Sequence, residues 1–351
     1  MNRIEAFRAA MSGAGIGAAL VTRGENLRYL TGFTGEGALL VGESASLFAN
    51  FLYAEQAERE ASGVRVELAK GAADRAGLIR ARLGDAGALA IESDEMTVDE
   101  FRELEGALPN ASFPPLGALL TDLRSMKDEG ELRAIRRACE IACEAFEAIL
   151  GEIRIGMTER EVQVALDRML SLKGSEGPAF PTIACAGPNG SLPHATPSDR
   201  PIREGELLTL DFGAVHQGYR SDMTRTVAIG EVSAELREMY DTALLAQTEA
   251  LAAIRAGARC DRVDAAAREV IDRKYPGAFG HSLGHGVGLM VHESPGLSSR
   301  ETRELAAGHV VTVEPGIYIR GVGGCRIEDM GAVTEDGFEN MIDADKRLIL
   351  I

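Results

Sequence analysis

Two segments far apart in the chain share one pattern, and this repeat restricts the fold more than any other feature of the sequence. The segments are GELLTLDFG at 205–213 and GHVVTVEPG at 308–316. Each contains a glycine, two aliphatic residues, a threonine, a further aliphatic residue, an acid and a closing glycine. A short apolar run bounded by glycines is typical of a buried strand. The repeat therefore predicts two equivalent strands, one ending at Asp211 and the other at Glu314.

Each predicted strand is followed by a segment that can return beside it as a hairpin. The returning segments are RSDMTRTVAIG, after HQGY, and CRIEDMGAV, after GVGG. A hairpin centred within the HQ dipeptide places Asp222 opposite Asp211, and one centred on the first glycine of GVGG places Glu328 opposite Glu314. Side chains directly opposite each other in an antiparallel pair lie about 4.5–5.5 Å apart at Cβ. The repeat thus predicts two similar half-domains that face each other, each presenting a pair of acids.

Four carboxylates at one junction repel one another, and each raises the pKa of its neighbours. Divalent cations remove this conflict, and four acids with an imidazole suit two ions that share bridging carboxylates. The segment GHSLGHGVGLMVHE at 280–293 supplies the imidazoles, because it contains His281, His285 and His292. The alternative is that acids at strand ends merely face solvent, which accounts for one such acid better than for four in matched positions.

The histidine segment also resembles two unrelated signatures. His281 and His285 have the spacing of two zinc ligands on a helix, but Ser282 stands where that signature has glutamate, and the glycines disfavour a helix. The residues GHSLG match the G-x-S-x-G of serine hydrolases, which requires a strand before the serine and a helix after it. The surrounding DRKYPGAF and glycine-rich segments predict neither element. A serine-type hydrolase that uses Ser282 is retained as the rival hypothesis.

The amino-acid composition limits the kinds of partner that the protein can bind. The chain of 351 residues has 37 basic and 54 acidic side chains, for a formal net charge of −17. Such a surface repels nucleic acids and anionic membranes. We find no signal peptide and no apolar run long enough to span a membrane. Five cysteines without a C-x-x-C pair are typical of a reduced, cytoplasmic protein.

The chain divides into two predicted domains. Residues 1–122 alternate helical and strand patterns, which indicates a small α/β domain, and PNASFPPLG ends it. Residues 123–351 begin with two helical segments and contain the repeat. All six histidines lie at 194 or later. The predicted fold class is therefore α/β (α+β), with the chemistry in the C-terminal domain.

These residues, taken in order, resemble the pita-bread metallopeptidases, and specifically their Xaa-Pro dipeptidase (prolidase) and aminopeptidase P branch. The matching elements are the strand acid of TLDFG, SDMTRT, GHGVG, VEPGIY and RIED. The resemblance extends over essentially the whole chain and implies a creatinase-type N-terminal domain followed by a pita-bread catalytic domain. It implies the following metal ligands: Asp211, Asp222, His285, Glu314 and Glu328. Asp211 would bind one ion, His285 and Glu314 the other, and Asp222 and Glu328 would bridge them.

The resemblance also implies roles around the ligands. His194 of LPHA, His281 and His292 would bind substrate and assist catalysis, Arg326 would order the site, and Glu314 would relay a proton. We add Phe180 of AFPTI as a candidate wall for the proline ring, with core packing as the alternative. We expect two divalent ions per chain, Mn²⁺ first and Co²⁺, Zn²⁺ or Fe²⁺ next, because affinity order alone does not select among them.

The expected reaction is hydrolysis of the peptide bond before proline by metal-activated water. The sequence does not separate a dipeptidase from an aminopeptidase that acts on longer peptides. A catalytically silent peptide-binding module is a third hypothesis, although such modules have lost ligands that this chain retains. The resemblance further implies a homodimer.

Overall fold

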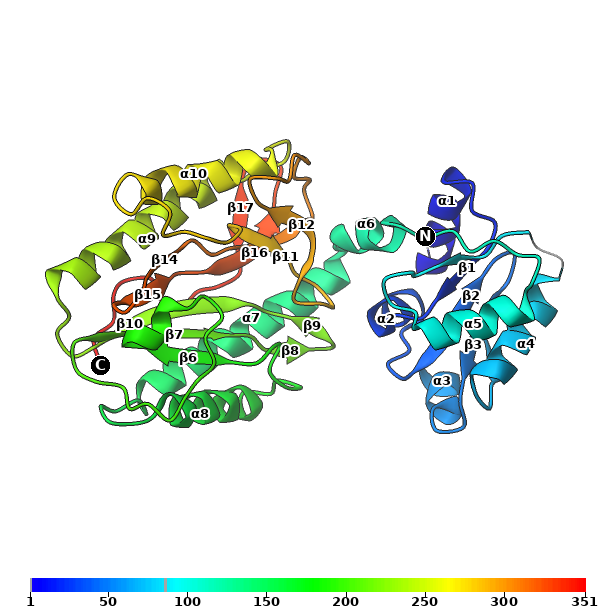
Figure 1. Ribbon diagram of the computed structural model, residues 1–351, viewed down its shortest axis with the longest axis horizontal. Coiled ribbons are helices and arrows are strands. Elements are labelled where there is room, and N and C mark those ends of the chain that lie inside the picture. Colours follow the sequence, from blue (N-terminus) through cyan, green and yellow to red (C-terminus); the bar gives the residue numbers. More distant parts are fainter. Residues whose placement is uncertain (1, 85–86) are drawn as a thin grey trace. The chain divides into compact units, whose positions relative to one another are not determined.

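The computed structural model describes residues 2–84 and 87–351. It separates into two compact units, one ending at Arg124 and one beginning at Ser125, which are described in turn (Figure 1).

The N-terminal unit alternates helices and strands. Its elements are α1 (Arg3–Gly13), β1 (Ala19–Val21), α2 (Gly24–Thr31), β2 (Gly37–Val41), β3 (Ala45–Ala49), α3 (Ala54–Glu60), β4 (Arg65–Leu68), α4 (Ala72–Leu83), β5 (Ala90–Ile91), α5 (Val98–Ala107) and α6 (Leu119–Ser125). The strands form one mixed sheet in the order β4-β3-β2-β1-β5. Leu20, Leu40 and Phe48 on this sheet pack against Ile79 of α4 and Leu104 of α5. The predicted α/β unit is confirmed, although the sequence patterns did not indicate α2.

The C-terminal unit begins with two helices and then consists of strands interrupted by a second helix pair. Its elements are α7 (Glu129–Leu150), α8 (Glu159–Leu172), β6 (Ile183–Ala186), a 3₁₀ turn (Gly187–Ser191), β7 (Glu206–Phe212), β8 (Val215–His216), β9 (Tyr219–Arg220), β10 (Met223–Ile229), α9 (Ala234–Ala253), α10 (Cys260–Asp272), β11 (Gly284–Gly286), β12 (Glu293–Leu297), β13 (Val310–Val313), β14 (Gly316–Ile319), β15 (Gly323–Arg326), β16 (Asp329–Val333) and β17 (Phe338–Asn340).

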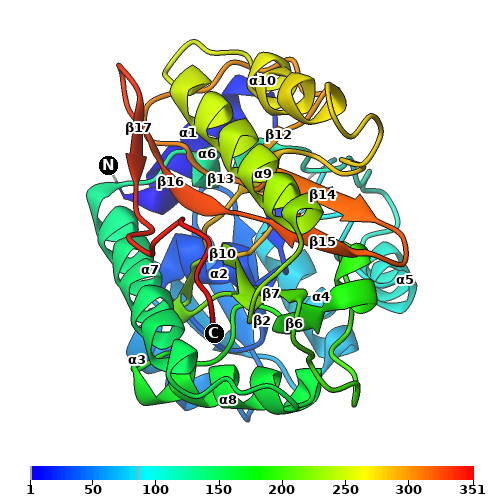
Figure 2. The same ribbon diagram turned by 90° about the vertical axis from the view of Figure 1, so that its left-hand side faces the viewer.

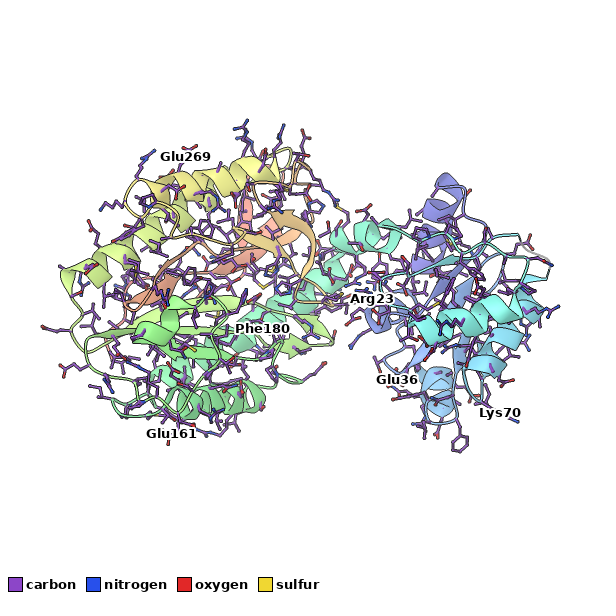
Figure 3. All side chains as sticks on the ribbon, in the orientation of Figure 1. Arg23, Glu36, Lys70, Glu161, Phe180 and Glu269 are labelled. Carbon is purple, nitrogen blue, oxygen red and sulfur yellow. The ribbon has the colours of Figure 1, made fainter. Side chains whose placement is uncertain are left out.

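The two predicted halves of this unit each combine a helix pair with a β ribbon. We call β7 to β10 the first ribbon and β13 to β16 the second ribbon. Helix α7 contacts β8 and β9, and α8 contacts β6, whereas α9 contacts β13, β14 and β15. Figures 1 and 2 show the strands between α7 and α8 on one side and α9 and α10 on the other. The exposed acids Glu161 of α8 and Glu269 of α10 accordingly point away from the strands (Figure 3).

Local sequence explains why these helices start where they do. Helices α7 and α8 both begin with a capping box, in which Asp128 pairs with Glu131 and Thr158 pairs with Glu161. Such boxes satisfy backbone N–H groups that a helix leaves without partners, and the acids also oppose the positive end of the helix dipole. Within the described residues, the helices are too short or too polar to cross a bilayer.

The register of the second ribbon agrees with the prediction, but that of the first does not. In the second ribbon, Val313 pairs with Asp329 and Gly316 pairs with Arg326, so Glu314 and Glu328 are aligned as expected. In the first ribbon, Asp211 pairs with Thr224 and not with Asp222. Asp222 therefore lies diagonally across from Asp211, on the same face of the ribbon, because side chains alternate along a strand.

The turn of the first ribbon explains this error. Gln217 and Gly218 have φ values of 49° and 73°, so they form the two central residues of the turn. A tight hairpin turn of the I′ type needs positive φ at both central positions, which favours glycine. The hairpin is therefore centred on QG and not on HQ.

The two ribbons meet edge to edge close to these acids. The backbone N–H of Glu328 donates to the carbonyl oxygen of Thr224 at 3.0 Å. The Thr226 hydroxyl donates to the carbonyl oxygen of Arg326 at 2.9 Å and accepts from its N–H at 3.2 Å. These bonds fix the end of one acid-bearing strand against the end of the other, as the repeat predicts.

Candidate metal centre

Five side chains from five strand regions converge on one cavity of about 320 Å³. Asp211 lies within β7, Asp222 immediately precedes β10, His285 is the central residue of β11, Glu314 follows β13 and Glu328 precedes β16. All five line the cavity. The structure therefore brings together the complete set of predicted metal ligands.

The His285 imidazole lies between the acids of the two ribbons. Its Nε2 is 3.5 Å from Oδ2 of Asp222 and 3.3 Å from Oε1 of Glu314. Its Nδ1 lies 3.1 Å from the carbonyl oxygen of Gly286. A ring nitrogen that donates to a backbone carbonyl fixes the ring and leaves the other nitrogen for a metal. Asp222, His285 and Glu328 each offer a ligand atom within 4.8 Å of the other two.

Two acids are held from the opposite ribbon. Nη2 of Arg326 donates to Oδ2 of Asp211 at 2.5 Å, and the Thr224 hydroxyl donates to Oε2 of Glu328 at 2.7 Å. Nε of Arg326 also donates to the Thr224 hydroxyl at 3.0 Å. Arg326 thereby reaches both acids, one directly and one through a threonine.

The remaining oxygens of these two acids have no hydrogen-bond partner. Oδ1 of Asp211 and Oε1 of Glu328 are among the buried side-chain atoms that lack a donor. Burying an ionised carboxylate oxygen without a partner is costly. Because both residues line the same cavity as the His285 ring, a cation is the partner that the donor set fits.

The charge state of the centre also indicates a cation. Burial, together with the neighbouring acids, raises the pKa values of Asp222 and Glu328 well above their usual range. Burial also raises the pKa of Asp211. For His285, burial lowers the pKa, but Glu314 and Asp222 outweigh it and raise the pKa to about 9. Without added positive charge, the centre therefore holds protons near neutral pH.

The other predicted residues lie in two places. Phe180, His194, His292 and Arg326 line the cavity, and the His292 ring lies 4.4 Å from the His285 ring, measured between ring centroids. Phe180 precedes β6 within the C-terminal unit (Figure 3). His281 does not line the cavity.

The His281 ring contacts Phe279 and Tyr318, which are not among the residues that line the cavity. Its Nε2 is 3.0 Å from the Tyr318 hydroxyl, and the ring packs edge-on against Phe279 at 4.9 Å. The Tyr318 hydroxyl in turn accepts from Nη1 of Arg326 at 2.6 Å. His281 is thus linked to the acids through Tyr318 and Arg326.

Two protein families match consecutive parts of the chain. The creatinase/prolidase N-terminal domain matches residues 3–126, and metallopeptidase family M24 matches residues 133–335, the region that contains all five converging side chains. The protein belongs to metallopeptidase family M24. The expected architecture, a creatinase-type domain followed by a pita-bread catalytic domain, is confirmed.

Solved and curated members of the family cover nearly the whole chain. A solved Xaa-Pro dipeptidase from Bacillus anthracis is 38% identical, covers 99% of each chain and has a TM-score of 0.95. The Xaa-Pro dipeptidase of Pyrococcus horikoshii is 36% identical over 95% of each sequence. A solved X-Pro aminopeptidase from Thermotoga maritima is 34% identical, covers 98% of this chain and 100% of its own, and has a TM-score of 0.90.

The rival serine signature of this M24 enzyme lacks the necessary surroundings. Ser282 is exposed in the segment between α10 and β11, and a strand of three residues follows it where a nucleophilic serine requires a helix. The G-x-S-x-G match therefore arises from the glycines around His281 and His285.

Sequence reasoning missed Thr224, which contacts the predicted ligand Glu328, and Tyr318, which contacts Arg326 and His281. A signal existed for both, because side chains two or four residues apart on a strand share a face. Thr224 follows Asp222 by two residues and Tyr318 follows Glu314 by four. Polar residues at those spacings from a predicted ligand are candidates for contacts with other residues of the same site.

Proposed function

We propose that this M24 metallopeptidase hydrolyses the peptide bond before proline, in dipeptides or in short peptides with proline in second position. The observation that carries the proposal is the convergence of four carboxylates and one imidazole on a single cavity, with two buried carboxylate oxygens that lack donors. The names of the relatives, Xaa-Pro dipeptidase and X-Pro aminopeptidase, support the choice of bond.

Two divalent cations are proposed to bind among the five side chains. Asp211 would hold one, His285 and Glu314 the other, and Asp222 and Glu328 both. The donor set is four carboxylates and one nitrogen, which supports Mn²⁺ first, with Co²⁺, Zn²⁺ or Fe²⁺ as substitutes. When bound, such ions act as Lewis acids that make water nucleophilic near neutral pH and polarise a carbonyl group.

The side chains of this protein would then transfer protons and stabilise the charge that develops on the substrate. Glu314 is proposed to accept the proton of the attacking water and to pass it to the leaving proline nitrogen. His194 and His292 would donate to the carbonyl oxygen as it gains negative charge. Arg326 would keep Asp211 in place through the 2.5 Å hydrogen bond, and His281 would orient the substrate side of the cavity through Tyr318.

An apolar wall supports the preference for proline. Phe180, Pro181, Ile183 and Val291 line the cavity on which the acids converge. A bond before proline is a tertiary amide without an N–H, so the ring must be recognised by shape. We propose that Phe180 forms the main face against this ring.

One assay series tests the proposal. The protein, stripped with a chelator and then loaded with Mn²⁺, is expected to cleave Xaa-Pro dipeptides or Xaa-Pro-Yaa tripeptides, and Xaa-Ala peptides far more slowly. Elemental analysis is expected to find two ions per chain. Two bound ions without turnover of any of these peptides would indicate the silent peptide-binding module instead.

The same series distinguishes the serine rival. A serine-directed phosphonate and the Ser282→Ala substitution are expected to leave turnover nearly unchanged, whereas the chelator abolishes it. Inactivation by the phosphonate in the presence of Mn²⁺ contradicts the metal mechanism.

We also propose that the protein is a homodimer and works in the cytoplasm. The family resemblance supports the dimer, and the five free cysteines support a reducing compartment. Light scattering at the concentration used for the assays tests the first point, and fractionation of the producing cells tests the second.

A further inference from the structure

The loop that carries His292 is the tip of a short hairpin. Strands β11 and β12 pair with Gly286 opposite Glu293, so residues 287–292 form the connection between them. Val291 and His292 in this loop both line the cavity. Glu293 follows His292 directly and is the first residue of β12. The position of His292 in the cavity is therefore tied to the position of Glu293.

The Glu293 carboxylate fills the inside of this loop. Its Oε1 accepts the N–H of Met290 at 2.9 Å, and the side chain is 5% exposed. A Cβ placed on Gly288 would lie only 2.6 Å from Oε2 of Glu293. The loop closes around the carboxylate, and a side chain at position 288 would displace it.

A buried ammonium group reaches this carboxylate from another part of the C-terminal unit. Nζ of Lys127 lies 3.3 Å from Oε2 of Glu293, and the Lys127 side chain is 1% exposed. The Lys127 N–H donates to the carbonyl oxygen of Gly308 at 3.1 Å, so its backbone is fixed as well. Lys127 also precedes Asp128, the N-cap of α7, where the helix dipole disfavours a positive charge. A buried cation at such a position needs an opposite charge beside it.

We propose that the Lys127–Glu293 ion pair is a positioning device that holds His292 against the reacting carbonyl. The inference rests on the proposed function, in which His292 faces the substrate. Lys127 is a positioning residue, since it acts through Glu293 and the loop. Breaking the pair takes the opposite charge away from the buried charge that remains, so the loop relaxes and the His292 ring moves from its place beside the His285 ring. The five proposed ligands are untouched, so metal binding persists.

A double-mutant cycle with His292 tests this device in the Mn²⁺-loaded enzyme. We expect His292→Ala to lower kcat about 10²-fold or more, as for the loss of one oxyanion donor. Lys127→Met and the milder Glu293→Gln are expected to lower kcat on the order of tenfold, with KM nearly unchanged and two ions still bound, because small misplacements of a catalytic group are costly. In the His292→Ala background, the same two substitutions are expected to lower kcat less than about twofold.

A matched control removes the same charge elsewhere. Lys173 is 37% exposed and lies 3.8 Å from Glu144. Lys173→Met is expected to leave kcat and KM unchanged.

The outcomes separate the inference from the proposed function. If the parent enzyme does not cleave Xaa-Pro bonds, or if His292→Ala is fully active, the proposed function or the role of His292 fails. If His292→Ala is slow but both Lys127→Met and Glu293→Gln turn over normally, only the positioning device is refuted. The positioning device is also refuted if the substitutions lower kcat equally in the parent enzyme and in the His292→Ala variant, or if they cause loss of metal. Either result indicates a structural effect that does not pass through His292. Glu293→Gln decides the matter if Lys127→Met does not fold.

Discussion

The two ribbons come from the same sequence pattern but hold their acids by different means. In the first ribbon, β7 and β10 pair without interruption over seven residues, and Asp211 lies inside this ladder. Asp222 lies between the β7–β10 pair and the β8–β9 pair, which belong to different sheets. In the second ribbon the ladder is broken, because Glu314 and Glu328 lie between the β13–β16 pair and the β14–β15 pair, which belong to different sheets. The first ribbon therefore presents one of its two acids from a continuous ladder, whereas the second presents both of its acids from a gap in the ladder.

The hydrogen bonds across the junction compensate for this difference. Arg326 of the second ribbon holds Asp211 of the first, and Thr224 of the first ribbon holds Glu328 of the second. The acids repeat, whereas their partners do not, since one is a guanidinium group and the other a hydroxyl group. A repeated strand thus supplies the symmetric ligands, and the asymmetric partners decide how firmly each ligand is fixed.

Removal of one bridging acid from either ribbon tests whether both contribute equally to the proposed centre, and it is expected to have the largest effect. We expect Asp222→Asn and Glu328→Gln each to lose bound Mn²⁺ and to lower kcat/KM by about 10³-fold or more, because Lewis-acid stabilisation is worth several kcal/mol. Elemental analysis and dipeptide assays measure both properties. Full turnover with two ions in either variant excludes a bridging role for that acid.

The cross-ribbon partners are expected to differ in their effect on stability. Arg326→Met leaves Asp211 without its buried ionic partner, which typically costs about 3–5 kcal/mol of unfolding free energy. Thr224→Val removes the hydroxyl that donates to Glu328 and accepts from Nε of Arg326, but it leaves the ion pair of Arg326 with Asp211 in place, so its cost is expected to be smaller, about 1–3 kcal/mol. Urea unfolding of the chelator-treated variants measures both. Equal losses would mean that the two partners are interchangeable, contrary to the difference between the ribbons.

The second ribbon also has more influence than the first on His285. Burial lowers the pKa of this imidazole, but its hydrogen bond and charge interaction with Glu314, followed by the charge of Asp222, raise the pKa to about 9. In the metal-free protein, NMR titration is expected to show His285 losing its proton only near pH 9. Glu314→Gln is expected to lower this pKa further than Asp222→Asn does. The opposite order would show that the first ribbon has the greater influence on His285.

The ribbons also show how far the sequence alone predicts the molecule. The repeat and its acids are local patterns, so they predicted the strands, the two halves and the convergence of the four acids, whereas His285 was selected among the histidines by the family resemblance. The register of the second ribbon followed from the glycines of its turn. The register of the first depended on which residue beside Gly218 takes a positive φ, and Gln217 carries no signal for that conformation.

Contacts between distant segments explain what the sequence did not predict. Tyr318 and Thr224 acquire their importance only when Arg326 reaches both of them, and Lys127 meets Glu293 across more than 160 residues of chain. Helix α2 was missed because it begins at Gly24 and has no side-chain cap, so no residue marks its start.

Substitutions in the turns of the two ribbons are expected to have the smallest effects on stability, and these effects are of opposite sign. Gln217 adopts a φ of 49° without the freedom of glycine, whereas Gly321, in the turn of the second ribbon, has a φ of 79°. Asparagine tolerates the left-handed region better than glutamine, so Gln217→Asn is expected to stabilise the protein by about 0.5 kcal/mol. Gly321→Ala forces a Cβ into the same region and is expected to destabilise it by about 1 kcal/mol. Thermal unfolding with Mn²⁺ present measures both shifts. If Gln217→Asn destabilises the protein, the glutamine side chain makes favourable interactions that outweigh the cost of its positive φ. The two turns would then differ in their side-chain interactions as well as in backbone conformation.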